Sequence, residues 1–175
     1  MAGSRVMFQV SDSTLGEFLV AQCENSICAL FFIGSCGRTV AMNDLKAAFP
    51  RSLVIEGNVR FVEQVRSILN GTCGCSNVPI HLKRSGDFTI AVWKELLKIE
   101  RGKTKTYSEV ATALGRPTAY RAVARACASN VIAVIVPCHR VIASSGHLSG
   151  YRWGIEIKKK LLAMEGDMDI FYTNL

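Results

Sequence analysis

The sequence contains no apolar run long enough to span a bilayer, and its first ten residues lack the apolar core of a signal peptide. It has no internal repeat and no low-complexity tract. What it does contain is ordinary for a folded globular protein, with 49% hydrophobic and 20% charged residues in a chain of 175. These features predict a soluble cytoplasmic protein, built as one domain or two small ones, without a membrane partner.

A regular cysteine framework is also missing. The seven cysteines are odd in number and irregularly spaced, which argues against a set of structural disulfides. Cys73 and Cys75 are separated by one residue, which is not the usual spacing of structural zinc ligands, even with Cys36 and His81 considered beside them. We therefore expect no metal site and no cofactor.

The charge is unevenly distributed along the chain. Residues 1–80 hold six basic and six acidic residues, whereas residues 81–175 hold fifteen basic and eight acidic ones and so carry the whole net charge of +7. An excess of this size can serve solubility alone. Beside a helix-turn-helix pattern it favours a polyanionic partner, most simply nucleic acid.

The N-terminal part predicts strands followed by helices. Three short apolar runs at residues 5–10, 15–22 and 26–33 are separated by polar turns and indicate an antiparallel meander. Residues 42–49 and 58–69 have helical spacing, and the turn-rich segment 70–79 is typical of a linker. The fold class is α/β (α+β): an N-terminal α/β domain of residues 1–78 with an antiparallel sheet and helices, and a mostly helical domain of residues 79–175.

The C-terminal part contains the helix-turn-helix candidate. An apolar stripe predicts a helix over 88–99, and a last helix is expected over 155–165. Between them, Thr106 and Glu109 match a capping box at the start of a helix that stops at Gly115. We expect Thr118 to cap a second helix and Asn130 to close it in the left-handed conformation. Two short helices joined by a tight turn form the candidate motif.

The aliphatic residues 131–136 predict a strand that ends at Pro137 and leads into Cys138-His139-Arg140. A cysteine acts as a nucleophile only as the thiolate, which needs a cation, an imidazole or a helix N-terminus nearby. Neighbouring side chains of an extended chain point to opposite faces, so a turn or a water must connect Cys138 with His139. The residues alone leave open that Cys138 is an inert buried thiol.

Several motifs in one order resemble the O6-alkylguanine-DNA alkyltransferase family. The resemblance is strong over residues 80–168, and it is most similar to the bacterial type, including the C-terminal half of the adaptive-response regulator. The motifs that carry it are the following: "VW" at 92–93, "GKTKTY" at 102–107, "RAVA" at 121–124, "PCHRV" at 137–141 with Asn130 upstream, "SGYRWG" at 149–154 and "LLAMEG" at 161–166.

The resemblance implies a site for alkyl transfer. Cys138 would accept the alkyl group from guanine O6, and possible substrates include O4-alkylthymine. His139 would act as base through a bound water, oriented by Glu165. Asn130 would tie the turn to the active-site strand, and Tyr107 would donate a proton or hydrogen bond to the leaving guanine. The thioether formed on the cysteine has no easy leaving group, so we expect one turnover per molecule.

The resemblance also implies a partner, which is double-stranded DNA bound by a monomer through the minor groove, in the nucleoid or, in a eukaryotic cell, the nucleus. Small side chains fit this groove, where base reading is degenerate. Arg121 would enter the duplex and fill the gap left by the flipped base. The pocket that binds the substrate would be lined by Tyr107, Val141, Tyr151 and Arg152. The other expected DNA contacts are Tyr120, Ala122, Ala124, Ser108, Arg116, Arg140 and Ser144.

Three readings from other classes remain open. The chain could bind alkylguanine without reacting, although such relatives lack the cysteine. It could be a helix-turn-helix regulator, although the alanine-rich second helix is unusual for a reader of the major groove. It could be a cysteine hydrolase, which would need an oxyanion hole and multiple turnovers.

Overall fold

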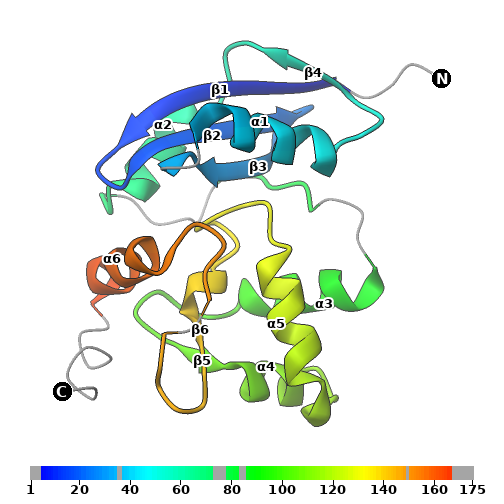
Figure 1. The fold of residues 1–175 in the computed structure, drawn as a ribbon, viewed down its shortest axis with the longest axis vertical. Helices are drawn as coiled ribbons and strands as arrows, with labels where there is room; N and C mark the ends of the chain where they lie inside the picture. Colours follow the sequence, from blue (N-terminus) through cyan, green and yellow to red (C-terminus); the bar gives the residue numbers. More distant parts are fainter. Residues whose placement is uncertain (1–4, 35–36, 73–77, 83–85, 149, 167–175) are drawn as a thin grey trace. The chain divides into compact units, whose positions relative to one another are not determined.

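The computed structural model describes residues 5–34, 37–72, 78–82, 86–148 and 150–166. The chain forms two compact units, shown in Figure 1: Met1–Lys83 together with Val131–Ala133, and Arg84–Asn130 together with Val134–Leu175. The aliphatic segment 131–136 is thus divided between the two units, which the sequence did not indicate. The domain boundary expected between residues 78 and 79 stays a prediction.

The first unit is built on a four-stranded sheet in the order β3-β2-β1-β4. Strands β1 (Arg5–Ser13), β2 (Gly16–Cys23) and β3 (Ser26–Phe32) form the expected antiparallel meander. Strand β4 (Leu53–Glu56) pairs in parallel with β1 and was not predicted. It is four residues long and nowhere fully buried, so its sequence lacks the long or strictly alternating pattern that marks a strand.

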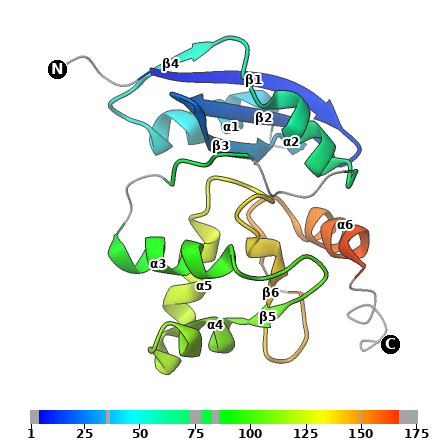
Figure 2. The ribbon, with the colours of Figure 1, turned by 180° about the vertical axis from the view of Figure 1, so that it is seen from behind.

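Helices cover both faces of this sheet. Figures 1 and 2 show α1 (Gly37–Ala48) on one side of the strands and α2 (Val62–Leu69) on the other. Four successive residues of β2 and six of β3 are buried, which requires cover on both faces. Both helices were predicted, but α1 begins five residues earlier and α2 four residues later than the apolar spacing suggested.

Strand β3 does not end the sheet with a free edge. Leu30 N–H donates to Val131 O at 2.8 Å, and Ala133 N–H donates back to Leu30 O at 2.9 Å. At the start of the strand, Ile27 N–H donates to Pro79 O and His81 N–H to Ile27 O, both at 2.8 Å. These segments satisfy backbone groups that an edge strand would leave unpaired.

The second unit is mostly helical, as expected. Its described helices include α3 (Asp87–Leu96), α4 (Tyr107–Ala113), α5 (Tyr120–Ala128) and α6 (Ile155–Glu165). Trp93 of α3 is buried and donates its indole N–H to Ala126 O of α5 at 2.8 Å. Strands β5 (Lys105–Thr106) and β6 (Val141–Ile142) form a short parallel pair. None of the helices in the described ranges is long and apolar enough to cross a membrane.

Helices α4 and α5 form the predicted helix-turn-helix, although its caps differ in part from expectation. The capping box is confirmed, with Thr106 and Glu109 satisfying each other's backbone N–H. Thr118 does not cap α5, because a 3₁₀ turn, Pro117–Ala119, precedes the helix and Ala119 is its N-cap. Asn130 does not adopt the left-handed conformation either: α5 ends at Ala128 with Ser129 as a right-handed C-cap.

Candidate active site around Cys138

Cys138 lies on a tight turn and not at the end of a strand, so the predicted strand over 131–136 is wrong. Residues 133–135 turn, with Val134 at a φ of 64°, a conformation that β-branched residues rarely adopt. A 3₁₀ turn, Cys138–Arg140, follows Pro137, and Cys138 N–H donates to Val136 O at 2.8 Å. A run of aliphatic residues predicts burial correctly here, but burial does not require an extended backbone.

Asn130 holds this turn through its side chain. Its amide Nδ2 donates to Val136 O at 2.9 Å and lies 3.2 Å from Cys138 Sγ. Only 1% of Asn130 is exposed, so both contacts are shielded from water. The hydrogen bond from Asn130 to Val136 O also spans Val134 and so helps to hold its left-handed backbone. The asparagine therefore connects the end of α5 to the sulfur, a link that the resemblance had implied in outline.

His139, Glu165 and Arg140 form a buried array beside the turn. His139 is fully buried, and its Nε2 lies 3.0 Å from Glu165 Oε1. Arg140 donates to both carboxylate oxygens of Glu165, at 2.9 and 2.8 Å, and to Ile99 O at 2.6 Å. The other ring nitrogen, His139 Nδ1, is buried without a hydrogen-bond partner among the described residues.

The pKa values of the array follow from these contacts. Burial lowers the pKa of His139, although the hydrogen bond and charge of Glu165 oppose this effect. Burial alone would raise the pKa of Glu165, yet the hydrogen bonds from His139 and Arg140 outweigh it and hold the pKa at about 2. At neutral pH the carboxylate is therefore ionised and paired with arginine, and the imidazole is neutral and able to accept a proton.

The sulfur of Cys138 is itself protonated at rest. Burial raises the pKa of the thiol to about 11, while the Asn130 hydrogen bond and the Lys158 charge act in the opposite direction. A nearby cation or imidazole lowers the pKa of a reactive cysteine, but here burial outweighs that effect. The thiol must instead lose its proton during a reaction, and this requires a nearby base that is neutral at the same pH.

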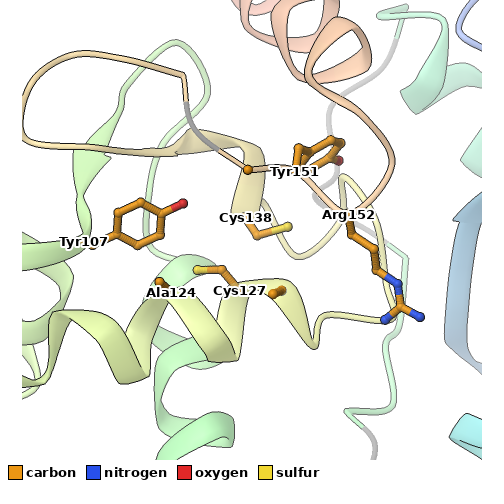
Figure 3. Close-up of a pocket in the computed structure, with 8 residues that line it drawn as sticks. Tyr107, Ala124, Cys127, Cys138, Tyr151 and Arg152 are labelled. Atoms are coloured by element: carbon orange, nitrogen blue, oxygen red, sulfur yellow. The ribbon is translucent and has the colours of Figure 1, made fainter.

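A cavity of about 420 Å³ opens onto the thiol, a size typical of small-ligand sites. Figure 3 shows the side chains of Tyr107, Cys127 and Cys138 around it, with Tyr151 and Arg152 contributed by the loop before α6. The hydroxyl of Tyr107 is directed toward the side where Cys138 lies. The wall is completed by Ala124, Ala128 and Gly150.

Two predicted pocket residues differ in their placement. Tyr151 lines the cavity, and its buried hydroxyl has no hydrogen-bond partner among the described residues. Arg152 also lines it, is exposed, and donates to Asn130 O at 3.2 Å. Val141, in contrast, is fully buried in β6 and is missing from the described residues that line the cavity.

Most of the expected DNA contacts are accessible. Tyr120 and Arg121 begin α5 and are exposed, with the guanidinium 5.7 Å from the ring centroid. Arg116 is exposed and lies 5.4 Å from the Phe88 ring centroid. Ser108 and Ser144 are exposed, and Ala122 and Ala124 are half-buried on α5.

Arg140 does not fit the expected contact with DNA. It is 8% exposed, and its guanidinium is committed to Glu165 and to Ile99 O. The contact was implied by the resemblance, and the sequence does not reveal that an arginine following a buried histidine is directed inward. Its geometry is that of a bidentate carboxylate partner.

Two residues of the site were missed by sequence reasoning. Cys127 lines the cavity, three residues after Ala124 and therefore on the same face of α5, a spacing that was available as a signal. Lys158 is fully buried, and its Nζ donates to Val141 O at 2.7 Å. It lies three and four residues before the buried Leu161 and Leu162, but the run of three lysines suggested a solvated surface.

Nothing in the described part of the chain gathers three or more His, Cys, Asp or Glu side chains into a metal-binding group. Of the four residues weighed as a metal site, Cys36, Cys73 and Cys75 lie outside the described residues, and His81 lies beside β3 in the first unit.

Comparison with known proteins gives a consistent answer. Residues 87–167 match the family described as the DNA-binding domain of 6-O-methylguanine DNA methyltransferase. The chain is 38% identical over 165 residues to the bifunctional transcriptional activator and DNA repair enzyme Ada of Escherichia coli, covering 93% of this chain and 46% of that protein. It thus spans about half the length of the Ada proteins that it matches.

Other relatives match over most of their length. The inducible methylated-DNA–protein-cysteine methyltransferase of Bacillus subtilis is 35% identical over 150 residues, covering 81% of this chain and 83% of that protein. The crystal structure of Mycobacterium tuberculosis O6-methylguanine methyltransferase has a TM-score of 0.76 at 34% identity, covering 91% of this chain and 92% of the other. Mycobacterium tuberculosis OGT in complex with DNA has a TM-score of 0.75 at 34% identity, covering 94% and 99%. With its cysteine turn, buried histidine and cavity in place, this chain belongs to the O6-methylguanine-DNA methyltransferase family.

Proposed function

We propose that this protein repairs alkylated double-stranded DNA by moving the alkyl group from guanine O6 to Cys138 Sγ, once per molecule. The observation that carries the proposal is the position of one thiol, which faces a cavity of about 420 Å³ while a neutral histidine follows it on the same turn. The names of the relatives supply the reaction class, and the turn supplies a nucleophile with a base at hand.

The proton of the thiol leaves before or as the sulfur attacks. His139 Nδ1 is buried and has no hydrogen-bond partner within the part of the chain that the structure describes, so a water between it and Cys138 Sγ would carry the proton to the imidazole. Glu165 remains ionised, because its pKa is about 2, and stabilises the imidazolium that forms. Arg140 fixes both oxygens of that carboxylate and so orients the histidine through it.

In the transfer step the sulfur–carbon bond forms while the carbon–O6 bond breaks. The electron pair remains with the guanine, and a hydrogen bond from Tyr107 compensates the developing charge on the base. The tyrosine begins α4, where the capping box fixes the backbone, and its hydroxyl is directed toward the cysteine side of the cavity. A thioether has no easy leaving group, so Cys138 stays alkylated.

Access to the damaged base requires that the nucleotide leave the helical stack, which costs roughly a few kcal/mol. The face of α5 supports entry through the minor groove, because Ala122 and Ala124 are small and Arg121 projects from the first turn. The arginine would occupy the space of the flipped base, and Tyr120 would pack beside it. Phosphate contacts from Ser108, Arg116 and Ser144 would give affinity without base reading.

All residues of the proposed site come from one unit of one chain, which supports action as a monomer. We keep residues 79–175 as the proposed DNA-binding and catalytic domain. The excess of basic residues in this domain would favour the acidic backbone of chromosomal DNA as its partner. The protein would then act in the nucleoid or, in a eukaryotic cell, in the nucleus.

Mass spectrometry of the intact protein tests the proposal directly. After mixing with duplex DNA that carries one O6-methylguanine, the protein should gain one methyl group in place of one hydrogen, at Cys138 and with a stoichiometry of one. A matched control is Cys127→Ala, which removes the other thiol of the cavity and should still gain the methyl group. Continuous turnover, or binding without a change of mass, would contradict transfer and favour a hydrolase or a damage-binding protein.

A further inference from the structure

Arg125 is an exposed arginine of α5 to which the proposed mechanism gives no role. The residues of this helix that pack inward are Val123, Ala126 and Cys127, which leaves an outer face in contact with solvent. Arg125 lies on that outer face one helical turn after Arg121, and both side chains are exposed. The two arginines therefore project from the same side of the helix that is proposed to enter the minor groove.

The rest of this outer face, after Arg121, carries short side chains. Its half-buried and exposed members are Ala122, Ala124, Ala128 and Ser129. Short side chains allow the helix to approach the floor of a groove closely, and a long side chain on the same face then extends along or into that floor. Arg125 is placed to make such a contact.

The guanidinium of Arg125 is not held by a neighbouring side chain. Within the part of the chain that the structure describes, it forms no hydrogen bond, ion pair or ring contact, and α5 itself contains no acidic residue. Arg121, in comparison, lies over the ring of Tyr120, and Arg140 is committed to Glu165. The donors of Arg125 are therefore available to a partner outside the chain.

The floor of the minor groove distinguishes A·T from G·C pairs by one group. An A·T pair in either orientation presents the acceptors adenine N3 and thymine O2, whereas a G·C pair adds the N2 amino donor of guanine. Arginine has donors and no acceptor, so it complements an A·T pair and meets a competing donor at a G·C pair. With a helical rise of about 1.5 Å per residue, Arg125 follows Arg121 by about 6 Å, which is about two base-pair steps.

We propose that Arg125 determines a sequence preference, by donating to adenine N3 or thymine O2 in the minor groove about two base pairs from the damaged base. This inference rests on the proposed function, because it needs α5 in the minor groove. It adds the reading of A·T neighbours to a surface whose other contacts are with phosphates.

The test is the affinity of the full chain for undamaged duplexes of equal length at one salt concentration, measured by fluorescence anisotropy. The duplexes are alternating A·T, alternating G·C and alternating inosine·cytosine. Inosine lacks the N2 amino group of guanosine, so its pair with cytosine keeps the major groove of G·C and presents only acceptors in the minor groove. The comparison thus isolates one minor-groove group, and undamaged DNA keeps the measurement independent of methyl transfer.

We expect the wild type to bind the A·T and inosine·cytosine duplexes about tenfold more tightly than the G·C duplex, as one complementary arginine contact would give. Arg125→Ala should bind all three duplexes alike. Arg116→Ala removes an exposed arginine that is proposed to contact phosphate, so it should weaken binding to all three by the same factor and keep the preference. Thermal unfolding of each variant verifies that it is folded.

Two results would overturn the inference. One is a wild type that binds the inosine·cytosine duplex no better than the G·C duplex. The other is an Arg125→Ala variant that keeps the wild-type preference, whether or not its affinity falls uniformly, since Arg125 would then contact phosphate or nothing. Methyl transfer to the wild type from duplex DNA with O6-methylguanine is measured separately. A protein that fails to methylate while the preference due to Arg125 persists would refute the transfer reaction and leave the reading of A·T pairs intact.

Discussion

The two units bury different kinds of side chain. Among the described residues of the first unit, the only buried polar side chain is Ser11, and the rest of its core is apolar. Within the described part of the second unit, five polar or charged residues are buried: Glu95, Asn130, His139, Arg140 and Lys158. Of these five, His139 and Arg140 belong to the turn Cys138–Arg140, Asn130 contacts Cys138, and Lys158 contacts Val141, the residue that follows the turn. Because buried polar groups lower stability unless they are paired, their concentration around one sulfur marks the part of the fold built for chemistry.

The largest expected difference between the units concerns two buried cysteines, Cys28 in the first unit and Cys138 in the second. Burial raises the pKa of both thiols, to about 12 for Cys28 in the sheet and to about 11 for Cys138. Cys138→Ala should abolish methyl transfer completely while DNA binding persists, because none of the other described cysteines is followed by the buried histidine that pairs with Glu165. Transfer is measured as methyl groups bound per molecule.

Cys28→Ala is the matched control in the first unit. It should transfer as the wild type does, with some loss of stability from the small cavity left by the sulfur. Transfer that survives in Cys138→Ala would place the nucleophile elsewhere.

The next largest effect should come from the buried arginine. Arg140→Met removes the partner of both oxygens of Glu165 and leaves that charge in the interior, so we expect the free energy of unfolding to fall by about 3–5 kcal/mol. Chemical denaturation measures it.

Arg38→Met offers the contrast in the first unit, where Arg38 pairs with Glu17 at the surface. This exposed pair should contribute nothing measurable. Similar losses for the two variants would mean that the second unit is not specialised in the way described.

Acidification should destabilise the second unit before the first, because two buried groups of the second unit have lowered pKa values. Burial lowers the pKa of His139 below the ordinary 6.5, so the unfolded chain takes up a proton first and stability falls as the pH drops below 6.5. Glu165, with a pKa of about 2 against the ordinary 4.5, adds a second loss of the same sign between pH 4.5 and about 2. Hydrogen exchange resolved by peptide should therefore show the second unit losing protection first. Earlier loss in the sheet would contradict this assignment.

The smallest effect concerns the surface. Arg121→Ala should slow repair of duplex DNA by about tenfold, which corresponds to about 1.4 kcal/mol, and should leave repair of single-stranded DNA unchanged, because only the duplex must release a stacked base. Single-turnover rates on the two substrates measure the ratio. Arg51→Ala removes an exposed arginine of the first unit and should change neither rate. An equal loss on both substrates would remove the role of Arg121 in base extrusion.

Local patterns in the sequence predicted the parts of the fold that depend on neighbours along the chain. The meander over β1–β3 and the capping box at Thr106 and Glu109 follow from alternation and short-range hydrogen bonding, and both are present. The expected caps of α5 at Thr118 and Asn130 are local features that failed, but the larger differences depend on distant partners. Strand β4 exists because β1 offers a parallel edge, and residues 131–133 pair with β3 across about 100 positions of sequence.

The candidate site shows the same division. A resemblance in motifs pointed to Cys138, His139 and Glu165, and the structure brings all three together. It could not reveal that Arg140 is directed inward, that Cys127 lines the cavity or that one lysine of three is buried. The types of residue were visible in the sequence, but their exposure was not.

The sequence by itself determined which chemical groups this protein has and which short segments form its helices and hairpins, because these depend on side-chain identity and on hydrogen bonds between near neighbours. The tertiary structure alone decided which of those groups lose their water. Burial lowers the pKa of His139, raises that of Cys138 and leaves Lys158 with one carbonyl as its partner. Since the free energy of a charge depends on everything packed around it, reactivity here is a property of the folded unit and not of the motif.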